Sequence, residues 1–332
     1  MFWDVTTSVL ELFIGVGVFL LAIVMLSKIF CEPSEKLTRF FKKTGKNRFT
    51  NVGLGIAVVG ITQSSTPTTV IIISLVGGGI LTLFQATGLV MGINIGSSLT
   101  SLLFVFSAFR IRYFIMFFIF IGAAMRLASK NEKLARVANV LITFGLLFIG
   151  LGMMSSALGN NEIIVDFFEG VFSRVTFPLW LFLIGTIFAT LIQSSSAAIG
   201  VSVAMVASGL LPFESAIFIV IGANLGTSFT AIIASLPGNR DAKRVGLFHV
   251  LFNLLGAILF LAIVWPLQGV LVPWYQGLIH DPVIQMSVFH VVFNAVTMLA
   301  LIAFIVPLNK LVRWVIDDRV EQDSDDYCRA FI

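Results

Sequence analysis

Residues 63–66 read QSST, and residues 92–100 read GINIGSSLT. The same pattern returns 130 positions later, as QSSS at 193–196 and GANLGTSFT at 222–230. The two copies align without a gap, and each keeps its polar residues inside sequence that is otherwise apolar. A duplicated unit of this kind is typical of secondary transporters. The two copies therefore predict a chain built from two equivalent halves.

The composition places the chain in a lipid bilayer. It is 58% hydrophobic and 11% charged, whereas ordinary soluble domains have about 45–50% and about 25%. The net charge of +4 is small and the basic residues sit in short loops, so they indicate topology rather than nucleic-acid binding. Cys31 and Cys328 fall in segments predicted to be cytosolic, and no disulfide or metal cluster is expected. Stretches of spanning length recur at 9–29, 82–109, 137–154, 213–236, 245–264 and 283–306, with a shorter one at 111–127.

The distribution of charge predicts how the chain crosses the membrane. All basic clusters lie on the cytoplasmic side only if residues 50–77 and 177–209 each form a re-entrant hairpin rather than a full span. The first hairpin then enters from the cytoplasm and the second from the outside. The N-terminus is expected outside and the C-terminus in the cytoplasm. The basic clusters are at 28–48, 126–136, 240–244 and 310–313.

The predicted fold class is an all-α polytopic membrane protein made of two inverted repeats. Each repeat holds a span, a re-entrant helical hairpin, a transmembrane helix unwound at its GxNxG motif, and a second span. One extra C-terminal span brings the predicted number of spans to seven. The predicted boundaries are 1–127 for the first repeat, 128–264 for the second, 265–316 for the final span and 317–332 for an acidic polar tail.

The polar motifs have the features of a binding site. Buried Gln, Ser and Thr are costly in hydrocarbon unless their polar groups are satisfied, and each QSS motif lies in mid-hairpin, near the membrane midplane. Thr66 followed by Pro67 is typical of a helix start, so the tip should open a half-helix whose N-terminus can hold an anion. Unwound GxNxG stretches would expose oxygen ligands for a small cation. The alternative is that Ser, Thr and Gly only let the spans pack closely, which the retention of both motifs in both copies disfavours.

The paired QSSS-type motifs, each followed by G-x-N-[IL]-G-[ST]-S-x-T, resemble those of the type II sodium-dependent phosphate cotransporter family over roughly residues 50–306. The resemblance implies sodium-coupled uptake of inorganic phosphate by alternating access. It implies that the tips bind phosphate through Gln63, Ser64, Ser65, Thr66, Gln193, Ser194, Ser195 and Ser196. It implies that the second motifs bind sodium through Asn94, Ser97, Ser98, Thr100, Asn224, Thr227, Ser228 and Thr230. The first tip departs from the family pattern, because Thr66-Pro67 stands where a third Ser is usual.

A second duplicated pattern lies near the C-terminal end. His249 to Asn253 reads HVLFN, and His290 to Asn294 reads HVVFN. The spacing places the His and the Asn of each copy on one helix face. A neutral His hydrogen-bonded between helices is the favoured interpretation, and proton coupling is the alternative.

No enzymatic constellation occurs in a common segment, so an enzyme is not expected. Sodium is the only metal and the only cofactor predicted, and phosphate, sodium and the lipid bilayer of the cell inner (plasma) membrane are the expected partners. A homo-oligomer is compatible with the sequence. Two other functions stay open: transport of another small anion such as sulfate or a dicarboxylate, and a membrane phosphate sensor or scaffold without net transport. The absence of Lys and Arg from both motifs favours a small oxyanion but does not select phosphate.

Overall fold

The computed structural model describes residues 2–30, 41, 44–108, 112–128, 131–159, 161–172 and 174–317. Cys31, Cys328 and the predicted tail beyond residue 317 lie outside the described residues. Within them all regular structure is helical, and six helices are long and apolar enough to cross a membrane. The prediction of an all-α fold is confirmed for the described residues, and their apolar helices are consistent with a multi-pass membrane protein. These helices are α1 (Phe2–Phe30), α5 (Leu83–Ser101), α8 (Glu132–Gly159), α12 (Phe213–Ser235), α13 (Arg240–Leu278) and α14 (Pro282–Leu301).

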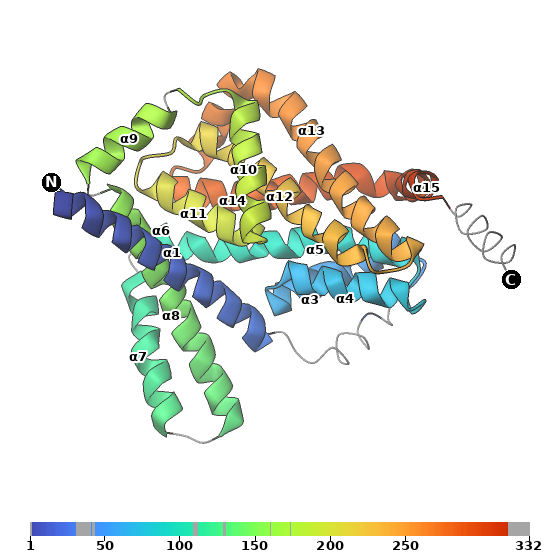
Figure 1. Cartoon of the computed structure of the whole chain (residues 1–332), viewed down its shortest axis with the longest axis horizontal. Coiled ribbons are helices and arrows are strands. Elements are labelled where there is room, and N and C mark those ends of the chain that lie inside the picture. Colours follow the sequence, from blue (N-terminus) through green and yellow to red (C-terminus); the bar gives the residue numbers. More distant parts are fainter. Residues whose placement is uncertain are drawn as a thin grey trace, which may run out of the picture.

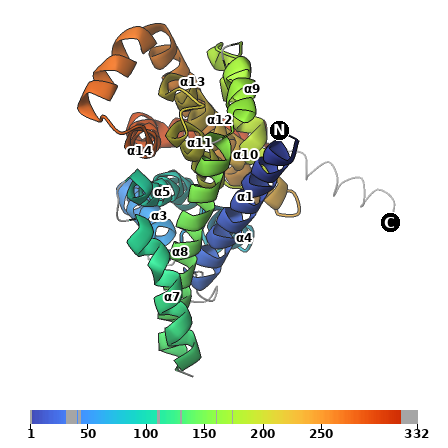
Figure 2. The ribbon, with the colours of Figure 1, turned by 90° about the vertical axis from the view of Figure 1, so that its left-hand side faces the viewer.

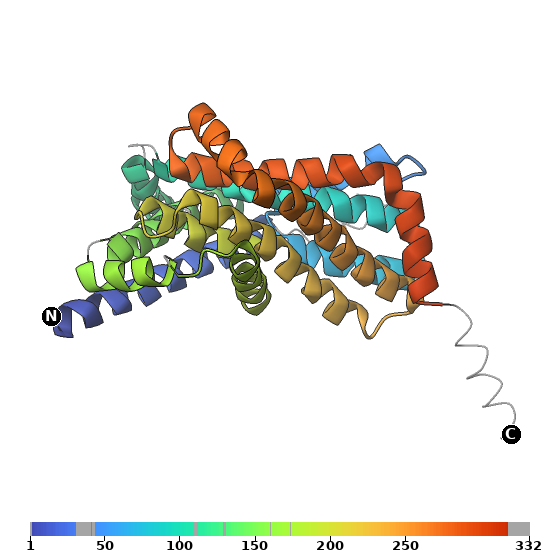
Figure 3. The ribbon, with the colours of Figure 1, turned by 90° about the horizontal axis from the view of Figure 1, so that it is seen from above.

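The two helices that carry the GxNxG motifs form the centre of the molecule (Figure 1). In the most apolar stretch of α5, 83% of the residues are buried inside the protein, and in that of α12 72% are buried. In the corresponding stretch of α1 only 17% are buried. The shorter α7 (Arg112–Ala128) pairs with α8, and the two extend away from the body (Figure 2). After a 3-10 turn at Ile302–Phe304, α15 (Ile305–Val315) turns away from the line of α14 (Figure 3).

Both predicted hairpin segments are helices interrupted at the QSS motif. The first unit comprises α3 (Arg48–Thr62) and α4 (Ser65–Gly77), and the second comprises α10 (Pro178–Ile192) and α11 (Ser195–Ala207). Gln63 and Gln193 mark the breaks, with φ of 52° and 58°, and they are the only non-glycine residues in the described part of the chain with positive φ. Such a left-handed backbone costs about 1–3 kcal/mol for a residue with a side chain. The entry of these units from opposite membrane faces stays a prediction.

The predicted helix start at Thr66-Pro67 is wrong by two residues. Ser64 is the N-cap and α4 begins at Ser65, so Pro67 is the third helical residue. Proline is tolerated there because the first N–H groups of a helix have no partner within it.

The far ends of the two units repeat the same backbone geometry. Gly79 has φ of 70° and Gly209 has φ of 81°. The N–H of Leu81 donates to the carbonyl of Leu75 at 3.2 Å, and 130 residues later the N–H of Leu211 donates to the carbonyl of Met205 at 3.2 Å. The duplication seen in the sequence thus extends to backbone conformation.

The two units pack reciprocally across the halves of the chain. The first helix of each unit lies along the next helix of its own half, α3 on α5 and α10 on α12. The second helix of each unit contacts the matching helix of the other half, α4 on α12 and α11 on α5. Figure 1 shows α5 with α3 and α4 on one side and α11 on the other. This arrangement brings both QSS breaks to the middle of the molecule.

The predicted unwinding of the GxNxG helices is wrong, because α5 and α12 are continuous α-helices through both motifs. Their glycines instead allow close packing. A Cβ added to Gly92 would collide with the carbonyl oxygen of Val52, and one added to Gly222 would collide with that of Phe182. At the glycines the close-packing alternative is therefore correct. The polar side chains are satisfied without breaking the helix, as where Asn94 Nδ2 donates to the carbonyl of Val90 at 2.9 Å.

Helical structure also extends beyond the stretches of spanning length. Helix α13 continues past the predicted span at 245–264 to Leu278, through Pro266 and Pro273. Proline removes one backbone hydrogen bond and kinks a helix without always ending it. The acidic segment after α8 forms α9 (Glu162–Phe172).

Candidate functional site

The two helix breaks meet each other. The hydroxyl of Thr66, at the start of α4, donates to the backbone carbonyl of Gln193 at 3.3 Å. The hydroxyl of Ser196, at the start of α11, donates to the carbonyl of Ser97 in α5 at 3.4 Å. The first tip, the second tip and the first GxNxG motif are thus brought together from segments far apart in sequence.

The side chain of Gln63 fastens the first tip to α5. Its Oε1 accepts a hydrogen bond from the hydroxyl of Thr100 at 2.7 Å, and its Nε2 donates to the carbonyl of Gly60 at 2.5 Å. Gln193, at the matching place in the second tip, is exposed. The side chain of Gln63 is therefore held by hydrogen bonds within its own half. The side chain of Gln193 is instead exposed and accessible to a ligand.

The tips carry hydroxyls that the protein does not use. Ser64 caps α4 without a side-chain hydrogen bond, whereas Ser194 accepts one from the N–H of Ala197 at 3.2 Å. Among the described residues, no hydrogen bond involves the hydroxyl of Ser65 or that of Ser195, the first residues of α4 and α11. The first N–H groups of each helix also lack intrahelical partners and carry the positive end of the helix dipole.

The predicted sodium ligands bond largely within their own helices. Ser97 donates to the carbonyl of Asn94 at 2.8 Å, and Thr227 donates to that of Asn224 at 3.1 Å. A hydroxyl whose proton points to a carbonyl still presents oxygen lone pairs to a cation. Ser98 and Ser228 are fully buried. Further bonds of this kind are Ser98 to Ile95 at 2.7 Å, Ser228 to Leu225 at 2.6 Å, Thr230 to Thr227 at 2.7 Å and Thr227 to Ala223 at 3.4 Å.

Two histidines outside the QSS and GxNxG motifs also contact the site. His249 Nε2 lies 3.3 Å from Asn94 Nδ2, and His290 Nε2 lies 3.2 Å from Asn224 Oδ1. The favoured prediction of hydrogen bonds between helices is confirmed for both. The signal in the sequence was the duplicated H-x-x-F-N pattern, but only the fold shows which asparagine each histidine meets.

Comparison with known proteins agrees with the duplicated motifs. A family model described as Na+/Pi-cotransporter matches residues 18–156 and 161–270. The chain belongs to this family. The predicted resemblance is confirmed, and both pairs of motifs lie within the matched residues.

Several relatives support the membership. A protein of Salmonella typhimurium named "Putative inorganic phosphate export protein YjbB" is 30% identical over 65% of this chain and 39% of its own length. The uncharacterized protein YqeW of Bacillus subtilis is 27% identical over 77% of this chain and 81% of its own length. Sodium-dependent phosphate transport protein 2A of mouse is 34% identical over 42% of this chain and 23% of its own length. The chain thus spans about two fifths of the length of the export proteins that it matches. No solved structure matches significantly.

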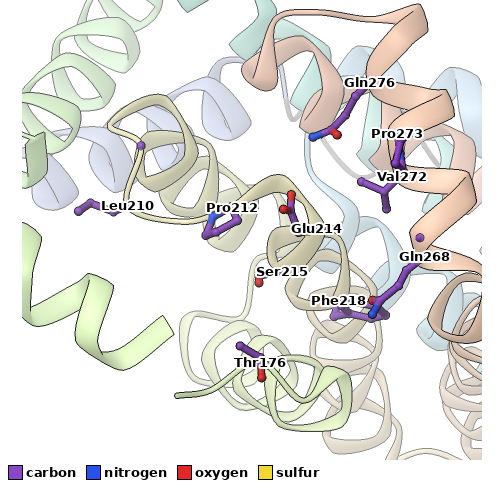
Figure 4. Close-up of a pocket in the computed structure, with 12 residues that line it drawn as sticks. Thr176, Leu210, Pro212, Glu214, Ser215, Phe218, Gln268, Val272, Pro273 and Gln276 are labelled. Atoms are coloured by element: carbon purple, nitrogen blue, oxygen red, sulfur yellow. The ribbon is translucent and has the colours of Figure 1, made fainter. Parts of the chain in front are cut away.

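A cavity of about 680 Å³ in the described part of this Na+/Pi-cotransporter family member lies away from the tips. Figure 4 shows Glu214 and Ser215, at the start of α12, opposite Gln268 and Gln276 of α13. None of the predicted site residues lines it. At 1.5 Å per helical residue, Glu214 in this cavity is about 15 Å along α12 from Asn224.

Proposed function

We propose that the chain is a secondary transporter that couples inorganic phosphate to sodium and binds phosphate between the N-termini of α4 and α11. One observation carries the proposal, the contact of Thr66 with the backbone of Gln193. It places two helix N-termini beside each other, together with the hydroxyls of Ser65 and Ser195, which have no partner among the described residues. First-turn N–H groups and hydroxyls are the donors that a small oxyanion needs.

The charge of the anion must be balanced at this depth. An unpaired ion inside a membrane protein is costly, and neither tip contains Lys or Arg. Sodium bound beside the anion would supply the missing positive charge. The carbonyl of Ser97 in α5 contacts the second tip through the hydroxyl of Ser196. Ser97 and its counterpart 130 residues later, Thr227 in α12, are therefore our candidates for the sodium ligands beside the tips.

The reciprocal packing of α4 on α12 and α11 on α5 supports two inverted repeats that alternately expose one site. In that arrangement both QSS units are re-entrant hairpins that insert from opposite faces. The cavity beside Glu214 would then open to the outside. It lies at the N-terminal end of α12, and the helix continues from there toward Asn224. We propose this cavity as the outer access route.

The inverted arrangement predicts labelling from opposite sides. In a chain with Cys31→Ser and Cys328→Ser, Glu162→Cys in α9 should react with a membrane-impermeant maleimide in intact cells. Pro237→Cys, between α12 and α13, should react only after permeabilisation. Both positions are exposed, so access to the reagent depends on the side of the membrane. The reverse pattern would contradict the proposed orientation.

Uptake into proteoliposomes tests the transport function. An inward sodium gradient should drive labelled phosphate to accumulate, and replacing external sodium with choline should abolish accumulation. Excess unlabelled sulfate should not compete. If sulfate competes as well as unlabelled phosphate, the substrate assignment is wrong.

A second candidate function is phosphate export, which the names of the bacterial relatives favour. We consider it in the form that does not depend on sodium. It predicts that phosphate-loaded vesicles release their content equally in sodium and in choline. Coupled transport predicts instead that release accelerates when sodium is placed inside the vesicles. Binding without movement in either direction would indicate a sensor.

A further inference from the structure

The two H-x-x-F-N motifs serve different halves of the chain. His249 and Asn253 lie on α13, and His290 and Asn294 lie on α14. His249 meets Asn94 of the first GxNxG motif, whereas His290 meets Asn224 of the second. Each of the two pairs thus contacts one half of the duplicated site, and the hydrogen bonds of the two pairs are not equivalent.

In the first half, His249 and Asn94 each have a polar atom without a hydrogen-bond partner in the described part of the chain. Asn94 Nδ2 lies 2.9 Å from the carbonyl of Val90, and because a carbonyl only accepts, this amide atom must be the nitrogen. The same nitrogen lies 3.3 Å from His249 Nε2, so Nε2 accepts and the ring proton of neutral His249 is on Nδ1. His249 Nδ1 is buried without a partner in the described part of the chain. Among the same residues Asn94 Oδ1 accepts no hydrogen bond, although Asn94 is only 5% exposed.

In the second half it is the amide of Asn224 that is fully hydrogen-bonded, and the buried atom without a partner in the described part of the chain is Oδ1 of Asn294. Asn224 Nδ2 donates to the carbonyl of Val220 at 2.9 Å, which again fixes the orientation of the amide. Its Oδ1 then accepts from Asn294 Nδ2 at 3.2 Å and from His290 Nε2 at 3.2 Å. The other ring nitrogen of His290 lies 3.1 Å from the hydroxyl of Ser101. Both lone pairs of Asn224 Oδ1 therefore accept hydrogen bonds from the protein. A ligand could bind this oxygen only by displacing His290 or Asn294.

We propose that the two halves of the site are unequal: Asn94 Oδ1 is a sodium ligand, and Asn224 is a structural residue locked by His290 and Asn294. Carbonyl oxygen is a ligand that hard cations prefer. Asn94 lies one helical turn from Ser97, whose carbonyl contacts the second tip, so a cation at Asn94 is next to the proposed phosphate. The proposal rests on the proposed function for the identity of the cation.

Sodium-dependent thermal stabilisation tests the asymmetry without phosphate and without transport. The midpoint of unfolding of the purified protein is measured across a titration of NaCl, with choline chloride keeping the ionic strength constant. Asn94→Leu keeps the volume but removes the oxygen, and it should raise the sodium concentration for half-maximal stabilisation by about 10- to 150-fold. Asn224→Leu should lower the midpoint in choline alone but leave the dependence on sodium within about threefold of wild type.

Asn294→Leu is the control in case Asn224→Leu does not fold. It removes one of the two donors to Asn224 Oδ1 and keeps both GxNxG asparagines, so its sodium dependence should match wild type. An equal loss of sodium affinity in Asn94→Leu and in either second-half variant would overturn the asymmetry while leaving sodium coupling intact. If wild type shows no more stabilisation by sodium than by choline, sodium coupling itself fails and the cation assignment fails with it.

Discussion

Ser65→Ala and Ser195→Ala should each weaken phosphate binding by about 10- to 150-fold, the range expected when one hydrogen bond to a charged ligand is lost. These serines begin α4 and α11, and among the described residues their hydroxyls have no protein partner. Removing them therefore leaves no buried group unsatisfied, and the folded protein should keep its thermal midpoint. Equilibrium binding of labelled phosphate to the purified protein in saturating sodium measures the effect.

Serines further along the same helices provide matched controls. Ser74 on α4 donates to the carbonyl of Val70 at 2.9 Å, and Ser202 on α11 donates to that of Ala198 at 3.0 Å. Ser74→Ala and Ser202→Ala remove the same atom away from the tips and should bind phosphate as wild type does. Wild-type affinity in both Ser65→Ala and Ser195→Ala would mean that the tips do not hold the anion.

Gly55→Ala should destabilise the protein by about 1–3 kcal/mol or more, as overpacking of a tight interior does. The added Cβ would collide with the backbone of α5, at the carbonyl of Leu89 and 3.0 Å from the Cα of Gly92. Backbone atoms cannot move aside as a flexible side chain can, so α3 and α5 must separate. The expected result is a lower thermal midpoint in detergent, with a larger aggregated fraction in size-exclusion chromatography.

A neighbouring glycine separates this effect from helix propensity. Nothing lies within 4 Å of a Cβ added to Gly53, which is on the same helix. Gly53→Ala should leave the midpoint unchanged or raise it, because alanine is favoured over glycine in a helix interior. Gly185→Ala, whose Cβ would collide with the carbonyl of Ile219, should behave like Gly55→Ala. Equal midpoints for Gly53→Ala and Gly55→Ala would contradict the close packing of α3 on α5.

The interruptions at the two tips could be predicted from the sequence because the evidence for them is local and appears twice. Each QSS motif divides an apolar stretch into two pieces too short to span a membrane alone, and the structure breaks both helices at the glutamine. The membership of the family follows from the same motifs. Repetition at a constant offset is a signal that a single sequence can carry.

The geometry of the GxNxG helices could not be predicted in this way. Glycines beside an asparagine are compatible with an unwound helix and with a helix packed tightly on another. The outcome depends on the carbonyls of Val52 and Phe182, which face Gly92 and Gly222 from other helices. The pairing of His249 with Asn94 joins residues 155 positions apart, and no local pattern indicates such a contact.

Phosphate binding across a sodium titration tests the central claim most directly. If sodium and phosphate occupy one site, sodium raises the affinity for phosphate by the same factor by which phosphate raises the affinity for sodium. The measurement is equilibrium binding of labelled phosphate to purified wild-type protein, with sodium replaced stepwise by choline at constant ionic strength. The account predicts that the affinity for phosphate falls progressively as sodium is withdrawn. Equal phosphate binding in sodium and in choline would contradict it and would favour an uncoupled or proton-coupled anion carrier.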